Sequence, residues 1–399
     1  MNTRTSETPI IESRHGNRLP WVALLVMALT GFIIIATETM PAGLLPQIAV
    51  GLNISEGTAG QFVSSYALGT VIAAIPAITL TRGMPRKPLL IIGLVGFLIA
   101  NTMTALSSDL MFSLVARFIA GAFSGLLWGM LAGYARRIVS PVHAGRALAI
   151  AMTGTPVALA VGTPLGSWIG TTSDWRWSFG AMSILSIIAI FCAVVFVPNA
   201  SGQQDATKLP LVRVFGIPGV SVVLAVVFAW MLAHNVLYTY IASYLGAAEV
   251  NLPVEVALVV FGVAALIGIW ITGVVIDRAL RHLVILSITT FAVAGAILTL
   301  GLQSQVALLI AIALWGLAFG GAATQLQTAM AKVSGENADV ANSVLTVSFN
   351  LAIFAAGVLG ALVVDIYGAM ILTTVMIGFS LLALTIVLAA RSSAFPAAS

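Results

Sequence analysis

Three side chains that carry or exchange a charge lie within long apolar segments of the chain: Glu38, Arg117 and His234. Such groups are costly in an apolar environment unless they are paired or face water, so a functional role is the first interpretation. Burial favours the neutral form of a carboxyl group, and a nearby cation favours its ionised form. If Glu38 and Arg117 lie close together, a movement that separates them would change how tightly Glu38 holds a proton. This chemistry can couple a proton gradient to another process.

Each of these residues also has a simpler structural interpretation. Glu38 and Arg117 could form a static buried ion pair, or the Glu38 side chain could extend to the outer membrane surface. His234 and the adjacent Asn235 are a second candidate for a proton or substrate site, because histidine changes its charge near neutral pH. The same polar pair could instead form an interhelical hydrogen bond.

Other polar and aromatic side chains within the apolar segments are candidates for a substrate cavity, because a site in the middle of a membrane places a few polar groups among aromatic ones. Tyr238 follows His234 by four residues and shares its helical face. Tyr238, Tyr240 and Tyr244 could equally belong to an aromatic belt at the membrane surface. The cavity candidates are Gln61, Asn101, Trp128, Asn235, Tyr238, Gln325 and Asn350.

The composition places the chain in a membrane. Apolar residues make up 60% of its 399 residues and charged residues only 8%, against about 25% charged in a soluble domain. The net charge of +4 does not indicate a nucleic-acid partner, because the basic residues do not cluster on a soluble face. The single cysteine, Cys192, excludes an intrachain disulfide or a cysteine-cluster metal site. The sequence contains no nucleotide-binding or metalloenzyme motif, so we expect no enzyme activity, no metal and no cofactor.

Long apolar segments predict an all-α membrane protein with twelve spans, since each span needs about 20 residues. The predicted spans are 21–45, 58–81, 88–107, 110–135, 146–170, 178–198, 218–246, 254–276, 283–302, 305–331, 338–364 and 369–390. A polar stretch after the sixth span is typical of a linker. We therefore predict an N-terminal tail (1–20), a six-helix bundle (21–198), a linker (199–217), a second six-helix bundle (218–390) and a C-terminal tail (391–399).

The basic residues predict the orientation. With the N-terminus in the cytoplasm, only Arg176 of the 17 lysine and arginine residues falls outside the membrane and Arg117 falls within a span. This distribution obeys the positive-inside rule, so both termini and the linker are expected in the cytoplasm. At 1.5 Å per residue, Glu38 lies roughly 10 Å and Arg117 roughly 12 Å from the outer ends of their spans. The two residues are therefore expected at similar depth.

Two basic loops follow the second span of each predicted half. The first reads Arg82-Gly83-Met84-Pro85-Arg86-Lys87 and the second reads Gly273-Val-Val-Ile-Asp277-Arg278-Ala-Leu-Arg281-His282. Their matching positions indicate an internal duplication. With this repeat, the chain resembles the major facilitator superfamily throughout its length. Its second loop is similar to the family signature G-x-x-x-D-R-x-G-R-R/K.

The resemblance implies that these loops latch one conformation of the protein. The first loop departs from the signature, because Arg82 occupies the acidic position, and in the second Leu280 replaces a glycine. The simpler interpretation is that the basic residues only set the topology. The latch residues implied by the resemblance are Arg86, Lys87, Gly273, Asp277, Arg278 and Arg281.

Further elements resemble the twelve-span drug/proton antiporters within this superfamily. Arg117 and Gly121 fit an R-x-x-x-G element in the fourth span. The segments from Thr37 to Pro46 and from Asp174 to Trp177 resemble a subgroup of sugar, purine nucleoside and chloramphenicol exporters. The fifth span carries an antiporter-like motif of Gly154, Pro156, Gly162, Pro164, Gly166 and Gly170.

The resemblance implies a role for each element. The first and fourth spans would lie together beside the cavity, with Glu38 and Arg117 as the proton-coupling pair and His234 as a further coupling candidate on the repeat counterpart of the first span. The glycines of the fifth span share one helical face and would seal the contact between the two halves, with bends at the prolines. Ordinary packing of small residues is the alternative.

We therefore expect a secondary transporter of the inner (plasma) membrane with a major facilitator fold. It would export a small organic solute, such as a sugar, a nucleoside or a drug-like compound, in exchange for protons by alternating access. Its energy source would be the proton gradient, and we expect a monomer in the lipid bilayer. Two alternatives remain: a proton symporter or facilitated uptake carrier, and a non-transporting membrane receptor or sensor.

Overall fold

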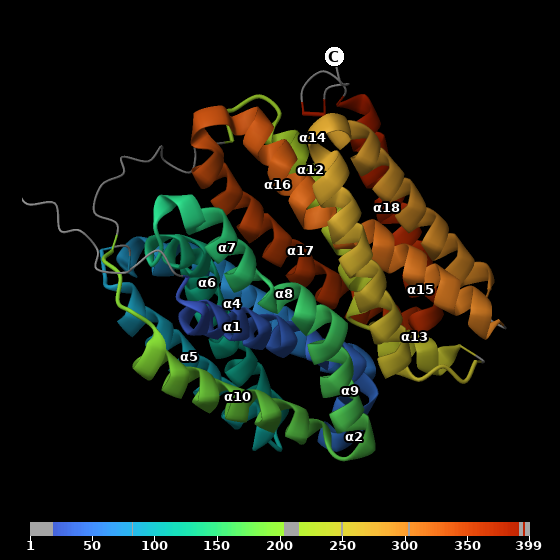
Figure 1. Cartoon of the computed structure of the whole chain (residues 1–399). Coiled ribbons are helices and arrows are strands. Elements are labelled where there is room, and N and C mark those ends of the chain that lie inside the picture. Colours follow the sequence, from blue (N-terminus) through green and yellow to red (C-terminus); the bar gives the residue numbers. More distant parts are fainter. Residues whose placement is uncertain are drawn as a thin grey trace, which may run out of the picture.

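The computed structural model describes residues 19–81, 83–202, 215–248, 250–301, 304–390 and 394–395. All regular secondary structure in these residues is helical. Ten segments of the described chain are long and apolar enough to cross a membrane. The long helices pack side by side (Figure 1), and many large apolar side chains remain exposed on their outer faces. This pattern suits a protein whose surface contacts lipid.

The helices before residue 200 form the first helix group, coloured blue to green in Figure 1. They are α1 (Trp21–Thr39), α2 (Leu45–Leu52), α3 (Glu56–Ala59), α4 (Gln61–Thr81), α5 (Arg86–Ala105), α6 (Leu110–Arg137), α7 (Ala144–Met152), α8 (Gly154–Val157), α9 (Thr163–Thr172) and α10 (Trp175–Phe196). Short 3-10 turns, η1 (Met40–Gly43) and η2 (Pro141–His143), and a π-helical turn, η3 (Ala158–Gly162), connect some of them.

The second helix group follows residue 219 and is coloured yellow to red in Figure 1. Its helices are α12 (Val220–Tyr238), α13 (Ile241–Ala247), α14 (Val254–Leu300), α15 (Gln305–Gly320), α16 (Ala322–Ser334), α17 (Ala338–Tyr367) and α18 (Leu372–Ala389). Two 3-10 turns, η4 (Gly335–Asn337) and η5 (Ala369–Ile371), precede α17 and α18.

The helix α14 contains two of the predicted spans, 254–276 and 283–302. Its backbone is helical throughout its 47 residues except at Ala279, where φ is −146° and ψ is 38°. The predicted loop from Gly273 to His282 is therefore almost entirely helical. This segment contains no proline that would interrupt the helix, and the only non-helical residue at the turn is Ala279.

Each of the other predicted spans corresponds to one helix or to consecutive helices. The span predicted over 58–81 is the proline-containing α4, and the span over 146–170 is divided among α7, α8, η3 and α9. Most of the predicted tails and linker lies outside the described residues, because 1–18, 203–214, 391–393 and 396–399 are not among them. Arg82 also lies outside.

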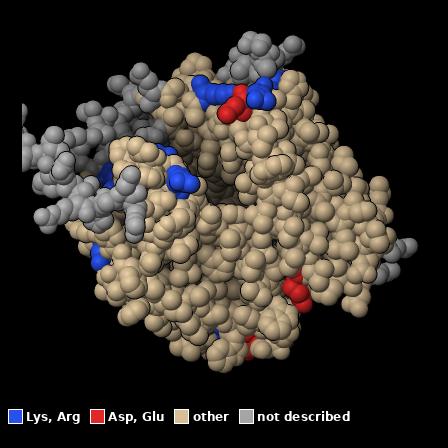
Figure 2. Space-filling view, in the orientation of Figure 1, with Lys and Arg blue, Asp and Glu red and all other residues tan. Residues whose placement is uncertain are grey.

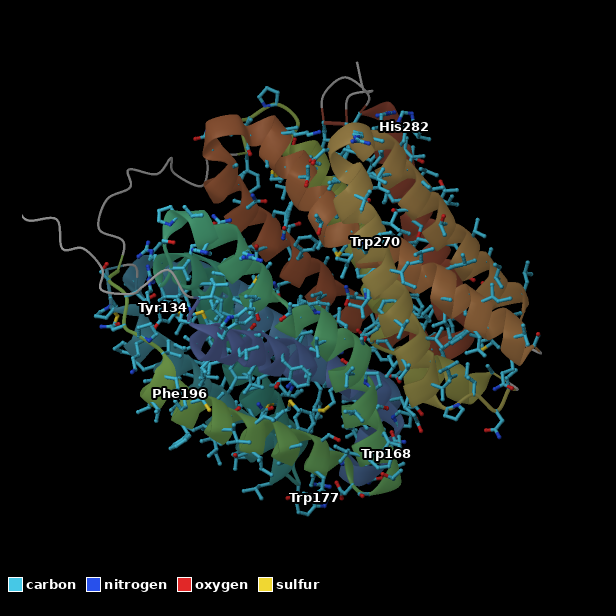
Figure 3. The ribbon with its side chains drawn as sticks, viewed as in Figure 1. Tyr134, Trp168, Trp177, Phe196, Trp270 and His282 are labelled. Carbon is cyan, nitrogen blue, oxygen red and sulfur yellow. The ribbon has the colours of Figure 1, made fainter. Side chains whose placement is uncertain are left out.

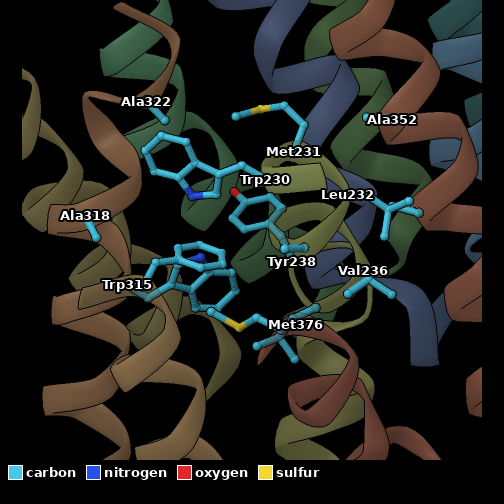
Figure 4. Close-up of a cluster of buried hydrophobic side chains, with 14 of the residues drawn as sticks. Trp230, Met231, Leu232, Val236, Tyr238, Trp315, Ala318, Ala322, Ala352 and Met376 are labelled. Atoms are coloured by element: carbon cyan, nitrogen blue, oxygen red, sulfur yellow. The ribbon is translucent and has the colours of Figure 1, made fainter. Parts of the chain in front are cut away.

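The two helix groups share a hydrophobic cluster, which also extends through the second group as far as Phe395. This cluster runs from Met40 and Phe62 in the first group to Trp230 and Leu258 in the second. Figure 4 shows its part around Trp230 and Trp315. A separate cluster belongs to the first group alone. Helices α3, α4, α9 and the turn η3 contact α14 and α17 across the boundary, so one end of the molecule is closed.

The other end of the molecule is open. Figure 2 shows a hollow between the two helix groups in the half that carries the C-terminus, with Lys and Arg side chains on either side of it. By the predicted topology this is the cytoplasmic half. The molecule is therefore closed toward the predicted outer side and open toward the predicted cytoplasm.

Candidate functional site

Glu38 lies in the last turn of α1. The α-helix ends at Thr39 and changes to the 3-10 turn η1, which contains Pro41, a residue without the N–H that would continue the helix. The Glu38 side chain is partly buried. Among the described residues, nothing donates a hydrogen bond to its carboxylate or pairs with it as an ion. The carboxylate is therefore free to change its protonation or its partner.

Arg117 lies on α6 and is fully buried. Its Nε donates a hydrogen bond to the carbonyl oxygen of Phe62 at 3.1 Å. The guanidinium group lies over the rings of Tyr66 and Phe179, with its central carbon 4.8 Å and 5.5 Å from the ring centroids. The Nη1 and Nη2 atoms are buried and have no hydrogen-bond partner in the described part of the chain. The protein thus holds a desolvated positive charge that aromatic rings only partly stabilise.

Tyr66 lies between Arg117 and the helix that carries Glu38, with the Arg117 guanidinium over its ring. The only ion pair within 4.0 Å among the described residues joins Arg176 to Asp174. Tyr66 connects the two elements, because its hydroxyl donates to the carbonyl oxygen of Ile34, one turn before Glu38, at 3.1 Å. The static ion pair of Glu38 and Arg117 is therefore not formed in this conformation.

His234 occupies a different kind of environment on α12. Its Nδ1 accepts a hydrogen bond from the indole Nε1 of Trp315 at 3.0 Å. Its ring stacks on Phe319, with centroids 3.4 Å apart, and on Tyr238, with centroids 4.9 Å apart. Because an indole nitrogen can only donate, Nδ1 carries no proton here. His234 is thus neutral within an aromatic cage.

Two cavity candidates, Asn101 and Gln325, are almost completely buried and do not line an open cavity. Asn101 donates from Nδ2 to the Thr37 hydroxyl at 3.3 Å. Gln325 donates from Nε2 to Thr272 at 3.2 Å and to Ser287 at 3.0 Å, and so joins α16 to both arms of α14. Their NH2 groups tie helices together, whereas their amide oxygens are buried without a hydrogen-bond partner among the described residues.

The remaining cavity candidates differ in their contacts. Asn235 and Asn350 donate to carbonyl oxygens of their own helices. Gln61 reaches across the group boundary to the carbonyl oxygen of Gly357 at 3.5 Å. Trp128 is partly buried and packs near Gly31. The buried Tyr238 hydroxyl has no hydrogen-bond partner among the described residues.

The glycines of the predicted antiporter motif face α1 and the turn after it. A β-carbon at Gly154 would overlap main-chain atoms of Ala28 and Phe32, and one at Gly162 would lie 2.8 Å from the Phe32 ring. Gly166 and Gly170 face Met40 and Leu44 in the same way. The predicted close packing is present, but it joins two elements of the first helix group.

The close contact between the two groups is made at another glycine. A β-carbon at Gly262 on α14 would lie 2.5 Å from the Cα of Ala160 and 2.7 Å from the carbonyl oxygen of Leu159. Both residues belong to η3, the π-helical turn between Pro156 and Pro164. The expectation that the motif glycines themselves seal the halves is therefore corrected: they shape the fifth span, and Gly262 packs against it.

The basic residues of the two predicted latch loops bind the ends of helices in their own groups. Lys87 Nζ donates to the carbonyl oxygen of Val194, near the end of α10, at 2.7 Å. Arg281 Nη1 donates to the carbonyl oxygen of Val387, near the end of α18, at 3.1 Å. Donor and acceptor are 107 residues apart in the first pair and 106 in the second. The two halves thus repeat the same contact.

Cations at these positions stabilise the carbonyl-rich ends of helices. The main-chain N–H of Arg86 also bonds to the carbonyl of Ala200. Gly273, Asp277 and Arg278 are exposed, and nothing lies within 4 Å of a β-carbon placed at Gly273. The second loop is therefore not engaged with the first helix group in this conformation.

An all-helical membrane protein of two helix groups, with a hollow that opens at one end, has the architecture of a secondary transporter. Residues 27–357 match the sequence profile of the Major Facilitator Superfamily, and the chain belongs to this superfamily. It is therefore a multi-pass membrane transporter and not an enzyme, and the predicted fold class is confirmed.

The chain is 29% identical over 374 residues to a chloramphenicol efflux pump of Mycobacterium tuberculosis, with 89% of this chain and 90% of the relative aligned. Two solved structures share the fold. The nucleoside transporter NupG matches with a TM-score of 0.77 and 14% identity over 93% of this chain and 99% of that chain. A D-xylose-proton symporter matches with a TM-score of 0.73 and 14% identity over 92% and 96%.

Sequence reasoning missed the residues that complete the two centres. Phe62 accepts the Arg117 hydrogen bond through its main-chain oxygen. Its apolar side chain does not indicate this contact in the sequence. Tyr66 and Trp315 lie in apolar runs in which any aromatic residue fits. The spacing of Trp315 and Phe319, four residues apart on one helical face, is a signal that could have pointed to the cage around His234.

Proposed function

We propose that this transporter exports a small organic solute in exchange for protons, by alternating access. The observation that carries the proposal is the buried Arg117 guanidinium, two of whose nitrogens have no hydrogen-bond partner among the described residues. Tyr66 joins it to the helix of Glu38, a carboxylate that is in no ion pair in the described part of the chain. A permanent cation beside a carboxyl group of variable protonation is suited to proton binding and release. The likeness to a chloramphenicol efflux pump supports the direction of transport.

The transport cycle follows from the change of Glu38 between its protonated form and its ionised form. In the conformation described here, the hollow faces the predicted cytoplasm, and Glu38 releases its proton there. Its ionised form is stabilised by Arg117, and the solute binds. After the protein changes to an outward-facing state, a proton from outside neutralises Glu38 and the solute leaves. A carrier of this type needs no nucleotide, since the proton gradient supplies the free energy.

The same proposal includes the orientation and the solute class. The positive-inside distribution favours cytoplasmic termini in the inner (plasma) membrane. The aromatic cage of the second group favours solutes with a flat apolar face, because aromatic rings stack on such surfaces. Chloramphenicol is therefore the first solute to test, followed by a purine nucleoside and a sugar.

Reconstituted proteoliposomes with an imposed pH gradient test the proposal. Addition of chloramphenicol should produce proton movement opposite to solute movement. Glu38→Gln keeps the shape but cannot release a proton, so proton-driven transport should fall to background while exchange of solute for solute continues. Glu255→Gln is the matched control, since the same change at a carboxylate in the first turn of α14 should leave transport unchanged.

The other interpretations give different results in this assay. A symporter would move protons and solute in the same direction, and a facilitated carrier would move solute without protons. A receptor would bind solute and move neither. Wild-type activity in Glu38→Gln would place the coupling elsewhere, and His234 would then be tested first.

A further inference from the structure

Tyr240 occupies the break between α12 and α13. Its backbone, with φ −107° and ψ 25°, is not helical, and this turns its side chain toward the first helix group. The side chains of Tyr240 and Tyr244 are fully buried, so neither belongs to an aromatic belt. By contrast, Trp168 and Trp177 are exposed and lie at the opposite end of the molecule from His282 (Figure 3). Those tryptophans are placed as a belt requires.

The Tyr240 hydroxyl connects the two helix groups. It lies 2.7 Å from the carbonyl oxygen of Gly357 on α17 and 3.2 Å from the carbonyl oxygen of Gly57 on α3. A phenol has one proton to donate, so the hydroxyl donates to either carbonyl while it remains beside the other. The hydroxyl thus lies within hydrogen-bond distance of main-chain carbonyls of both groups, and its contact with Gly57 crosses the boundary.

Two glycines make room for the ring. A β-carbon at Gly60, in the first group, would overlap the phenol end of Tyr240, and a β-carbon at Gly360, in the second group, would overlap the ring. Since real β-carbons do not approach other atoms so closely, only glycine fits at either position with the ring in place. The ring is held in a slot with one wall from each group.

Neighbouring contacts strengthen the same boundary. The Ser55 hydroxyl donates to the Asp365 carboxylate at 3.1 Å, and Gln61 donates to the carbonyl oxygen of Gly357 at 3.5 Å. Ser64 packs against Gly357 and is almost completely buried. All these contacts lie at the closed end, and each would break if the two groups separated there.

We infer that Tyr240 is the residue that holds the outer gate closed, with its ring in the slot between Gly60 and Gly360 and its hydroxyl between the carbonyl oxygens of Gly57 and Gly357. The inference rests on the alternating-access part of the proposed function. It assigns to Tyr240 a positioning role in the transport cycle, through the balance between inward-open and outward-open states, rather than contact with the solute.

The test measures access to the gate from outside. Ser64→Cys, in a Cys192→Ser background, places a thiol behind Tyr240, and a membrane-impermeant maleimide is added outside oriented proteoliposomes without solute. Tyr240→Phe should increase the labelling rate about five- to tenfold, because a net hydrogen bond contributes on the order of 1 kcal/mol. Tyr244→Phe is the matched control. Its hydroxyl donates to Leu298, also at 2.7 Å, but within the second group, so labelling should not change.

A second pair of variants tests the slot. Gly60→Ala should expel the ring and raise labelling more than Tyr240→Phe, roughly tenfold or more, since overpacking costs about 1–3 kcal/mol. Tyr240→Ala added to Gly60→Ala removes the collision but also the bridge, so labelling should stay high. A thiol at Ser186, buried inside the first group, should remain unlabelled in every variant and reports unfolding.

The outcomes separate the gate from the proposed function. Labelling at Ser64→Cys that is equal in wild type, Tyr240→Phe and Gly60→Ala, with folded protein throughout, would overturn the inference even if export is normal. An increase in Tyr244→Phe equal to that in Tyr240→Phe would also overturn it, because the effect would then be general loosening. Failure of the wild type to move protons and solute would instead count against the proposed function and leave the labelling result standing.

Discussion

The two helix groups contain buried polar centres of opposite character. In the first group, Arg117 carries a positive charge, has two nitrogens without hydrogen-bond partners among the described residues and is joined through Tyr66 to the helix of Glu38. In the second group, His234 is neutral and enclosed by aromatic rings, and its Nδ1 is already occupied by Trp315. One centre retains unsatisfied charge and the other is satisfied. In the proposed function, this difference is the reason why proton coupling is placed in the first group and contact with an aromatic solute in the second.

The largest effect is expected from removing the charge of the first centre. In Arg117→Ala, an ionised Glu38 would be buried without a cation, at a cost of about 3–5 kcal/mol. Glu38 should then keep its proton, so export at neutral pH should nearly cease and recover partly as the pH rises. The pH dependence of export is measured as efflux from proteoliposomes at several pH values from roughly 6 to roughly 9.

Arg117→Lys is the control for that variant. It keeps the charge but loses the planar group that lies over Tyr66 and Phe179, so it should retain part of the activity without the shift in pH profile. If the pH profile of export in Arg117→Ala equals that of the wild type, Arg117 does not control proton release from Glu38.

The next effect concerns the packing beside Glu38. Gly162→Leu should push α9 and η3 away from Phe32 on α1, at a cost of about 1–3 kcal/mol, and abolish transport while solute binding is partly preserved. Gly133→Leu, at a glycine with nothing within 4 Å of its β-carbon position, is the control. A scintillation proximity assay measures solute binding, and efflux from reconstituted proteoliposomes measures transport. Normal efflux in Gly162→Leu would contradict a close-packed fifth span.

A smaller effect is expected from the second centre. Trp315→Phe keeps an aromatic ring but removes the donor to His234, so stability should fall by about 1 kcal/mol. Solute affinity should weaken, whereas the pH profile of export should stay that of the wild type. If Trp315→Phe or His234→Gln shifts the profile as Arg117→Ala does, the second centre also couples protons and the comparison fails.

The smallest effect tests the symmetry of the two groups. Lys87→Gln and Arg281→Gln each remove a cation from the end of a helix, at a cost of about 0.3–1 kcal/mol. The thermal unfolding midpoints of the two variants should fall by similar amounts. Asp277→Asn, at an exposed carboxylate in the second loop, should leave stability unchanged and alter only the balance between conformations. If only one of these two variants loses thermal stability, the contacts of Lys87 and Arg281 are not equivalent in the two helix groups.

Much of the fold could be predicted because the signals are local. Runs of about 20 apolar residues and their polar separators mark the spans, and the rarity of charge within lipid singles out Glu38 and Arg117. This signal fails around Ala279, where polar residues interrupt the apolar run but the chain is helical on both sides. Periodicity correctly placed Gly162 and Gly166 on one face, but a pattern in one segment cannot say which element it meets.

The contacts that complete the sites are distant in sequence and could not be predicted. Trp315 reaches His234 over 81 residues, and Tyr240 reaches Gly57 over 183. Tyr240 lies at a depth that suits a membrane-surface belt, and only the fold reveals that it points inward. Asn101 and Gln325 were expected beside water because they are polar, yet their NH2 groups bond to neighbouring helices while their amide oxygens are buried without a partner among the described residues.

The repeated helix-end contacts also bear on how the protein is made. Lys87 leaves the ribosome 107 residues before its acceptor, Val194, and Arg281 leaves it 106 residues before Val387. At about 5–20 residues per second, each lysine or arginine waits roughly 5–20 s for its partner. Each contact can form only when the last helix of its own group has been inserted, and neither needs the other group. The first half of the chain can therefore be completed and checked in the membrane before synthesis of the second half is finished.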